Sequence, residues 1–352
     1  MAKRVVYIGT YTGRGSEGIY RAAVDCQAGT LELLDAVPSE NPSYVALARN
    51  GRTLYATAET MTYNGRHGGA VRAFAVGPQG RLTYLNEQPT EGQLTCHLAT
   101  DPGDRRLFCA NYQEGTATVF PLAADGSLGA EARFLVHPGA GPNPRRQEKA
   151  HVHFTRLTPD DRFLAVADLG MDEVTLYPFD GEAGVAEPPA VVREEAGSGP
   201  RHLDFTPDGR FAYLVCEMGN LVIAHAYDGK TLTPFQRIST VPEGITEAES
   251  TCAAIRVSPD GRFVCASNRG HDSLAVFAIA GDGRLTPVQI APCGGQVPRD
   301  FVYAPGGGFV LVANQESSRL SLLAAAEDGR LTDTGRYLEV PHPTCVCFGG
   351  EL

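Results

Sequence analysis

Hydrophobic runs that end in polar residues recur along this chain about every 50 residues. The runs start at Val5, Leu54, Leu107, Phe163, Phe211, Phe263 and Phe309. Successive starts are 49, 53, 56, 48, 52 and 46 residues apart. The stretches between them show no helical periodicity, and a repeat of this length is typical of propellers and related folds. The pattern therefore predicts seven β-rich units.

Residues 199–220 show how the strands of one unit are arranged. Two apolar runs, residues 203–206 and 211–216, flank a Pro-Asp-Gly sequence, which is the composition of a tight turn between antiparallel strands. Comparable inner runs start at Ser43, His97, Val152, Ala253 and Asp300. Third and outer strands follow each hairpin. Four antiparallel strands per unit predict the blades of a seven-bladed β-propeller, an all-β fold.

The two ends of the chain are expected to share one blade. The first unit begins directly with its second strand at Val5, whereas an unpaired apolar run starts at Thr344 near the C-terminus. If the C-terminal run completes the N-terminal blade, the ring closes and leaves no sheet edge exposed. The whole chain, residues 1–352, is then one propeller domain.

Composition limits the kind of partner. The net charge is −11 and the sequence contains no run of Lys or Arg, so we expect neither nucleic-acid nor membrane-surface binding. The nine cysteines are scattered within apolar runs, which favours free, buried thiols in a reducing compartment. No long apolar segment follows the N-terminus, and we expect a cytoplasmic protein. The oligomeric state is not predicted.

Polar side chains gather where inner strands begin and second strands end, which is one mouth of a propeller's central channel. They are Glu59, His97, Asn111, His151, His153, Asp168, Arg201, His202, Glu217, Glu249, Asn268, Arg269, Arg299, Asn314 and Gln315. The other mouth carries the repeated turn sequence and is expected to be scaffold. Because a site needs groups that converge from several blades, the first mouth is predicted to hold it.

The only long irregular segment, residues 137–149, is expected beside the same mouth. A polar loop in such a place is either a lid with ligand contacts, for which Arg146 and Gln147 are the candidates, or a plain surface excursion.

The chemistry of the candidate residues leaves several roles open. His151 and His153 stand at i and i+2, on the same side of a strand, and suit acid-base chemistry, substrate binding, a structural role or, with a third ligand that the sequence does not place, a metal site. Arg201 and Arg269 suit recognition of a carboxylate, phosphate or oxyanion, or pairing with nearby acids. Glu217 is either a general base or neutralised by Arg201.

Several enzyme classes lack their motifs. The chain has no G-x-S-x-G elbow, no Walker A sequence and no dinucleotide fingerprint, and it contains no tryptophan and hence no WD repeat signature. Serine hydrolysis and nucleotide chemistry are therefore not supported.

A series of motifs, in order, resembles the bacterial lactonase family of seven-bladed propellers over the whole chain. They include GTYT at Gly9, CHLA at Cys96, ANYQEG at Ala110, RQEKAHVHF at Arg146, GPRHLDFTPDG at Gly199, SNRG at Ser267 and PRDF at Pro298. The resemblance implies a metal-independent lactone hydrolase without a cofactor, acting on 6-phosphogluconolactone in the pentose phosphate route. Alternatives are a muconate-type cycloisomerase, a lactonase of another substrate, and a non-catalytic binding propeller.

The resemblance also implies roles for single residues. The expected catalytic set is His151, Arg201, Glu217 and Arg269. The expected substrate-binding set is His153, Arg146, Gln147, Asn111, Asp168, His97, Arg299 and Asn314. The chain departs from the family at Ala254, where many members have an acidic residue, and nearby Glu249 is not an assured replacement.

Overall fold

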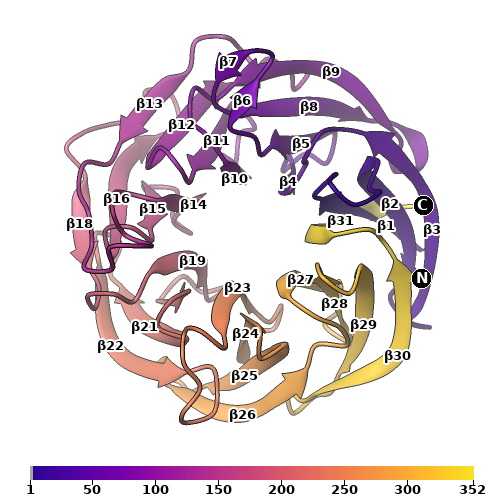
Figure 1. Cartoon of the computed structure of the whole chain (residues 1–352), viewed down its shortest axis with the longest axis vertical. Coiled ribbons are helices and arrows are strands. Elements are labelled where there is room, and N and C mark those ends of the chain that lie inside the picture. Colours follow the sequence, from indigo (N-terminus) through magenta and orange to yellow (C-terminus); the bar gives the residue numbers. More distant parts are fainter. Residues whose placement is uncertain (1–2) are drawn as a thin grey trace.

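The computed structural model describes residues 3–352, and its strands form seven radial sheets around a central channel (Figure 1). This confirms the predicted seven-bladed β-propeller. The sheets follow one another around the ring in chain order, from the N-terminal blade in indigo to the last blade in yellow. One 3-10 turn, η1 (Pro78–Gly80), is the helical element of the described chain.

The strands of the first four blades, from the channel outward, have the following bounds. The first blade is β31 (Pro343–Glu351), β1 (Arg4–Thr10), β2 (Gly18–Asp25) and β3 (Thr30–Pro38). The second is β4 (Val45–Leu47), β5 (Thr53–Ala58), β8 (Ala70–Val76) and β9 (Leu82–Pro89), with the small hairpin β6 (Thr62–Tyr63) and β7 (Arg66–His67). The third is β10 (Thr95–Thr100), β11 (Arg106–Asn111), β12 (Thr116–Pro121) and β13 (Arg133–Val136). The fourth is β14 (Val152–Leu157), β15 (Phe163–Asp168), β16 (Glu173–Asp180) and β18 (Ala190–Arg193), with β17 (Gly184–Val185) also paired to β16.

The remaining three blades each have four strands. The fifth is β19 (Pro200–Phe205), β20 (Phe211–Cys216), β21 (Leu221–Tyr227) and β22 (Leu232–Ser239). The sixth is β23 (Thr251–Val257), β24 (Phe263–Arg269), β25 (Ser273–Ile279) and β26 (Leu285–Pro292). The seventh is β27 (Pro298–Tyr303), β28 (Phe309–Asn314), β29 (Arg319–Ala325) and β30 (Leu331–Glu339).

The ring closes through the predicted clasp. Strand β31 pairs antiparallel with β1, with Ile8 opposite Val346 and Gly9 opposite Cys345. The C-terminal strand thus supplies the inner strand that the N-terminal blade lacks. Every inner sheet edge then faces the channel rather than another molecule, which removes the template for edge-to-edge pairing.

The core lies between blades, and strand β20 shows why a nearly continuous apolar run suits it. Successive side chains of a strand point to opposite faces, and in a propeller each face meets a neighbouring blade. Leu214 packs toward Ala165 and Ala167 of the fourth blade. Tyr213 packs toward the sixth blade, where its hydroxyl donates to the Gly283 carbonyl at 2.9 Å.

The turn side of the ring is repetitive scaffold, as predicted. In three consecutive blades a Ser or Thr hydroxyl donates to the Asp of the turn two residues later. The pairs are Thr158 to Asp160, Thr206 to Asp208 and Ser258 to Asp260, each at 2.6 Å. No helix of residues 3–352 is long and apolar enough to cross a membrane.

Residues 137–149 are not the only long irregular segment, so that part of the prediction was wrong. Residues 240–250, between β22 and β23, also lie outside the strands, and the β6–β7 hairpin is a third insertion. The segment 241–250, VPEGITEAES, has turn-forming residues and no apolar periodicity. Its length as a loop was not predicted because it lies between two regular strands.

Candidate active site at the channel mouth

β-Bulges at the start of inner strands turn selected side chains into the channel. The pairing of β19 with β20 skips a residue between Pro200 and His202, so Arg201 is the extra residue of a bulge. The same register shift occurs in β14 at His153 and in β27 at Arg299. A bulge leaves one residue outside the ladder and re-aims its side chain. Bulges of this kind therefore set the directions of the Arg201, His153 and Arg299 side chains.

Glu217 is the centre of the arrangement. It follows β20 directly, and its side chain is only 6% exposed. Its Oε2 accepts from Arg201 Nε at 2.9 Å and lies 2.9 Å from Arg269 Nη2. Its Oε1 accepts from Nη2 of Arg146, which reaches in from the 137–149 loop. The structure thus brings together three of the four residues expected to be catalytic, and Arg146 with them.

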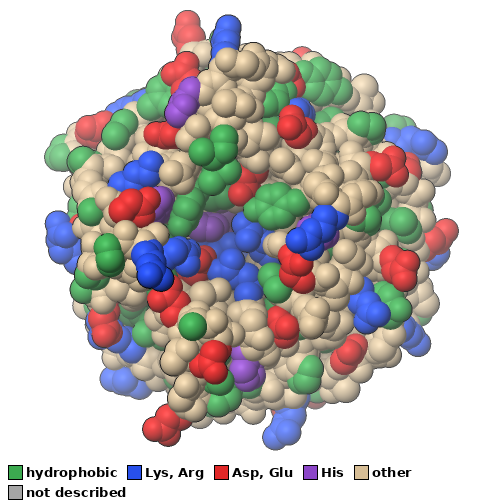
Figure 2. Space-filling view, in the orientation of Figure 1, with side chains coloured by type: hydrophobic (Ala, Val, Ile, Leu, Met, Phe, Trp, Pro, Cys, Tyr) green, Lys and Arg blue, Asp and Glu red, His purple; other side chains and the backbone are tan. Residues whose placement is uncertain are grey.

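The charges in this cluster do not balance. Three guanidiniums surround Glu217, and the carboxylate of Glu247 lies 3.8 Å from Arg146, so three arginines face two carboxylates and one positive charge is in excess. Burial alone would raise the pKa of Glu217, but the guanidiniums of Arg269 and Arg201 outweigh it and hold the pKa well below its ordinary value. Burial and then Arg269 lower the pKa of Arg201 to about 10, so it remains cationic at neutral pH. Figure 2 shows the blue Lys and Arg side chains gathered on the floor of the central hollow.

The backbone at the adjacent bulge of β23 anchors two of these arginines. Arg201 Nη1 donates to the Ala253 carbonyl at 2.7 Å, and Arg269 Nη2 donates to the Cys252 carbonyl at 2.9 Å. The ladder between β23 and β24 is interrupted between Cys252 and Ile255, which frees those carbonyls. By contrast, Arg269 Nε is buried and has no partner. The Arg269 side chain as a whole is 15% exposed, against 3% for Arg201.

A second chain of polar groups lies across the mouth. Arg299 Nη2 donates to the Tyr11 hydroxyl at 2.8 Å, and Tyr11 donates to Glu59 Oε1 at 2.9 Å. The Ser43 hydroxyl donates to the other oxygen of Glu59. Arg299 also stacks over the Tyr11 ring, with its Cζ 5.3 Å from the ring centroid. Arg299, Arg201 and Glu59 line one small void, so the two chains adjoin.

His151 stands at the mouth but not in the arginine cluster. Its ring stacks on Tyr112 with centroids 4.4 Å apart, and its Nδ1 lies 2.9 Å from the Tyr112 carbonyl. The Tyr112 hydroxyl in turn contacts Arg146 through a side-chain hydrogen bond. His151 therefore adjoins the arginine cluster through Tyr112 and Arg146.

His151 and His153 both contact the ring of Tyr112, whose centroid is 4.4 Å from that of His151 and 5.6 Å from that of His153. The bulge between Val152 and Phe154 interrupts the strand between them. His153 also belongs to a buried group of rings around His202, whose centroid is 5.4 Å from that of His153 and 5.2 Å from that of His97. Burial, and then nearby arginines, hold the pKa of all three well below its ordinary value, so they are neutral packing groups.

Four residues expected to bind substrate hold the scaffold instead. Asn111 bonds to Thr95, Thr116 and Thr118, and Asn314 Nδ2 bonds to Cys293 and Ser321. Asp168 accepts from the backbone of His151, Gly170 and Met171, and Gln147 bonds to Leu169 and Asn143. All four are fully buried. Their described hydrogen bonds therefore fix neighbouring backbone and loops, while His97 packs among the buried rings.

Four residues with no role expected from the sequence complete the mouth. Tyr11 and Tyr112 lie inside the GTYT and ANYQ motifs, Glu59 belongs to the polar rim, and Glu148 lies between Gln147 and the histidines. Glu247, in the 240–250 loop, is 3.8 Å from Arg146. The motifs signalled these positions, but only the packing of the loops shows their contacts.

Ala254 does not face the mouth. It is fully buried in the apolar cluster between the sixth and seventh blades, together with Leu274 and Val312. Glu249 does not replace the missing acid, because its carboxylate accepts from the backbone and hydroxyl of Thr246 at the surface. The described residues contain no group of three or more His, Cys, Asp or Glu arranged to hold a metal ion.

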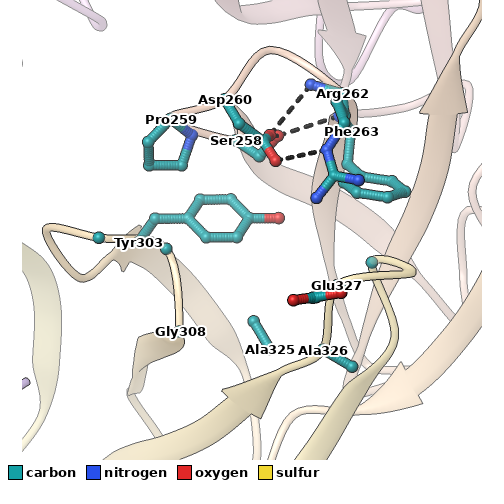
Figure 3. Close-up of a pocket in the computed structure, with 13 residues that line it drawn as sticks. Ser258, Pro259, Asp260, Arg262, Phe263, Tyr303, Gly308, Ala325, Ala326 and Glu327 are labelled. Atoms are coloured by element: carbon teal, nitrogen blue, oxygen red, sulfur yellow. Dashed lines mark hydrogen bonds and ion pairs between the residues drawn. The ribbon is translucent and has the colours of Figure 1, made fainter. Parts of the chain in front are cut away.

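A cavity of about 380 Å³ opens on the opposite, turn side between the sixth and seventh blades (Figure 3). The charges of Arg262 and Asp260 in its wall pair with each other, since Arg262 Nε donates to Asp260 Oδ2 at 2.6 Å. Tyr303 projects into the space, and glycines 306–308 form one wall. It gathers no set of groups comparable to the arginine-lined mouth.

The fold and the mouth together define a seven-bladed propeller with a buried cluster of arginines around one carboxylate at the mouth of its channel. Residues 5–348 match the family model described as "Lactonase, 7-bladed beta-propeller". The chain belongs to this lactonase family. It is 38% identical over 308 residues to the 6-phosphogluconolactonase of Bacillus subtilis (strain 168), a match that covers 86% of each chain.

Solved structures agree over nearly the whole length. A structure described as the Pseudomonas aeruginosa periplasmic gluconolactonase superposes with a TM-score of 0.93 at 34% identity, covering 99% of this chain and 100% of that one. A Lactobacillus plantarum protein superposes with a TM-score of 0.90 at 36% identity, covering 98% of this chain and 99% of that one.

Proposed function

We propose that this protein is a lactone hydrolase that opens 6-phosphogluconolactone with an activated water and without a metal ion. The observation that carries the proposal is the excess positive charge of Arg146, Arg201 and Arg269 around Glu217, at a mouth that also holds His151. Such a site attracts an anionic substrate and stabilises the oxyanion that forms at its carbonyl. The Bacillus subtilis relative supports the choice of substrate.

His151 is the better candidate for the general base. A base must hold a free lone pair near neutral pH, and Glu217 is neutralised by three guanidiniums that keep its pKa low. His151 is fixed by the Tyr112 carbonyl at Nδ1, so Nε2 is the nitrogen that can accept a proton from water. Glu217 then serves to hold the arginines in place.

Arg269 is the best-placed donor for the developing oxyanion. Its Nη2 is fixed by Glu217 and the Cys252 carbonyl, and its side chain is 15% exposed at the mouth, against 3% for Arg201. A donor that is already oriented costs no reorganisation as charge moves onto the carbonyl oxygen. Arg201 supplies further positive charge beside Glu217. Its own hydrogen bonds hold it to Glu217 and to the β23 backbone.

Arg299 is proposed to recognise the phosphate at the far end of the substrate. Replacing Arg299 with Gln is expected to raise KM for 6-phosphogluconolactone about tenfold to a hundredfold while changing kcat less, because a charge-assisted contact of this kind contributes about 1.5–3 kcal/mol. The same variant should change KM for unphosphorylated gluconolactone by less than about twofold. Steady-state kinetics with both lactones measures the difference. An equal loss for both substrates would contradict a phosphate-specific role.

The proposed function is tested by hydrolysis of freshly made 6-phosphogluconolactone, with and without a chelator, by the wild-type protein and by Arg201→Ala. The wild type should act well above the spontaneous rate and be insensitive to chelator, whereas the variant should be close to background. Rates no higher than spontaneous hydrolysis would overturn the proposal and leave a non-catalytic binding propeller. Loss with chelator would overturn the metal-free mechanism. Faster turnover of carboxy-muconate lactone would instead indicate a cycloisomerase.

We place this reaction in the cytoplasm, as a step of the pentose phosphate route. All nine cysteines are free and seven of them are buried, which suits a reducing compartment. The Pseudomonas aeruginosa neighbour is described as periplasmic, so fractionation of the native host is the deciding measurement.

A further inference from the structure

Glu148 contacts the ring of His151 at the edge of the mouth. Its Oε1 lies 3.2 Å from His151 Nε2, the nitrogen that faces away from the Tyr112 anchor. The two residues differ sharply in access to solvent, because the His151 side chain is 3% exposed and that of Glu148 is 46% exposed. Glu148 therefore connects a buried imidazole with bulk water.

The Glu148 carboxylate lies where it can accept a proton from His151. His151 Nδ1 faces a backbone carbonyl, and Nε2 faces a carboxylate oxygen, which is an acceptor when the carboxylate is ionised. A proton that Nε2 takes up in the reaction therefore has an acceptor 3.2 Å away that is itself in contact with solvent.

The proposed reaction also has to export a proton. Water gives one proton to His151 Nε2 as its oxygen bonds to the lactone carbonyl carbon. When the bond between that carbon and the ring oxygen breaks, the ring oxygen takes this proton and becomes a hydroxyl. The carboxylic acid that results ionises at neutral pH, so lactone and water give a carboxylate and one H⁺. That last proton must reach solvent in every turnover.

We propose that Glu148 passes to bulk solvent the proton that the product acid releases: His151 Nε2 takes up this proton once the ring oxygen has been protonated, and Glu148 accepts it from Nε2 and gives it to water. This role rests on the proposed lactonase function. Glu148 acts through His151 and does not contact the reacting atoms. Gln147 beside it is buried and bonded to the Leu169 carbonyl, whereas the Glu148 side chain is 46% exposed and so reaches solvent.

The other charged and titratable groups around the pair are few. Tyr112 stacks on His151 and Asp168 Oδ1 accepts from the His151 backbone N–H. Burial raises the pKa of Glu148, but a hydrogen bond from its own backbone, the His151 contact and, least of all, the charge of Lys149 outweigh burial and lower the pKa. Arg146 lies on the far side of Tyr112.

The test compares Glu148→Gln with the wild type at low and high concentrations of imidazole buffer. Glu148→Gln is expected to lower kcat about tenfold to a hundredfold in dilute buffer, since positioned proton transfer contributes about 10²–10⁴-fold. Added imidazole should restore much of the loss in the variant, because a small buffer can replace the missing carrier, and should leave the wild type unchanged. Glu148→Asp should retain intermediate activity without buffer.

Glu243→Gln is the matched control, because Glu243 is an exposed acid on the neighbouring loop at the same mouth. It should show wild-type kcat and no response to buffer. If Glu148→Gln keeps wild-type kcat at all buffer concentrations, or loses activity that no buffer restores, the proton-carrier role is overturned while the lactonase function of the wild type stands. An inactive wild type would instead remove the lactonase function itself.

Discussion

Arg269→Ala is expected to lower kcat/KM for 6-phosphogluconolactone about 10²–10³-fold, which is the usual cost of removing one oriented oxyanion donor. Most of the loss should fall on kcat, because the proposed contact of the Arg269 guanidinium with the carbonyl oxygen strengthens only as negative charge develops on that oxygen. Steady-state kinetics on the variant and on the wild type, extrapolated to saturating substrate, separates the two parameters.

Two further variants sharpen this prediction. Arg269→Lys keeps the charge but loses the forked geometry, so it should recover only part of the activity. Arg237→Ala is the control, since Arg237 is an exposed arginine on β22 that pairs with Glu195 at the rim of the ring, and it should be indistinguishable from the wild type. A variant at Arg269 that raises KM and leaves kcat unchanged would show that this arginine binds the ground state instead.

The fold could be predicted from the sequence because it follows from local patterns that repeat. Each blade needs four short strands and a tight turn between the inner two, and the spacing of apolar runs shows both directly. The clasp could be predicted because an unpaired run at Thr344 and a missing inner strand before Val5 are complementary. These features depend on composition along the chain and need no knowledge of the neighbouring blade.

The site could be predicted only in part because its geometry depends on bulges and loops. A single extra residue decides that Arg201 enters the channel and that His153 joins the buried ring of His202. No composition signal marks such a residue. Likewise Asn111 and Asp168 end second strands at the rim, as predicted, yet each side chain finds backbone and hydroxyl partners nearby and turns away from the channel.

Glu217→Gln is expected to destabilise the fold by about 3–5 kcal/mol, because it removes the one carboxylate that compensates the buried guanidinium of Arg201. Activity should fall as well, since Arg201, Arg269 and Arg146 lose their common partner and repel one another. Chemical denaturation of the variant and wild type measures the stability, and lactone hydrolysis measures the activity. If Glu217 were the general base instead, the variant would lose activity while keeping wild-type stability.

The same variant should change how stability depends on pH. The pKa of Glu217 is lower in the folded chain than its ordinary value of 4.5, so its ion pairs contribute fully above that pH and their contribution is lost as the pH falls toward the lowered value. Between pH 7 and about 4.5 the difference in unfolding free energy between wild type and Glu217→Gln should be constant, and below this range it should shrink. A difference that stays constant down to pH 2 would show that Glu217 is not the ionised partner of the arginines.

A double variant that combines Glu217→Gln with Arg201→Met should recover most of the stability, because the buried positive charge that needed the Glu217 carboxylate is gone. Its activity should stay lost, because the guanidinium of Arg201 is missing from the mouth.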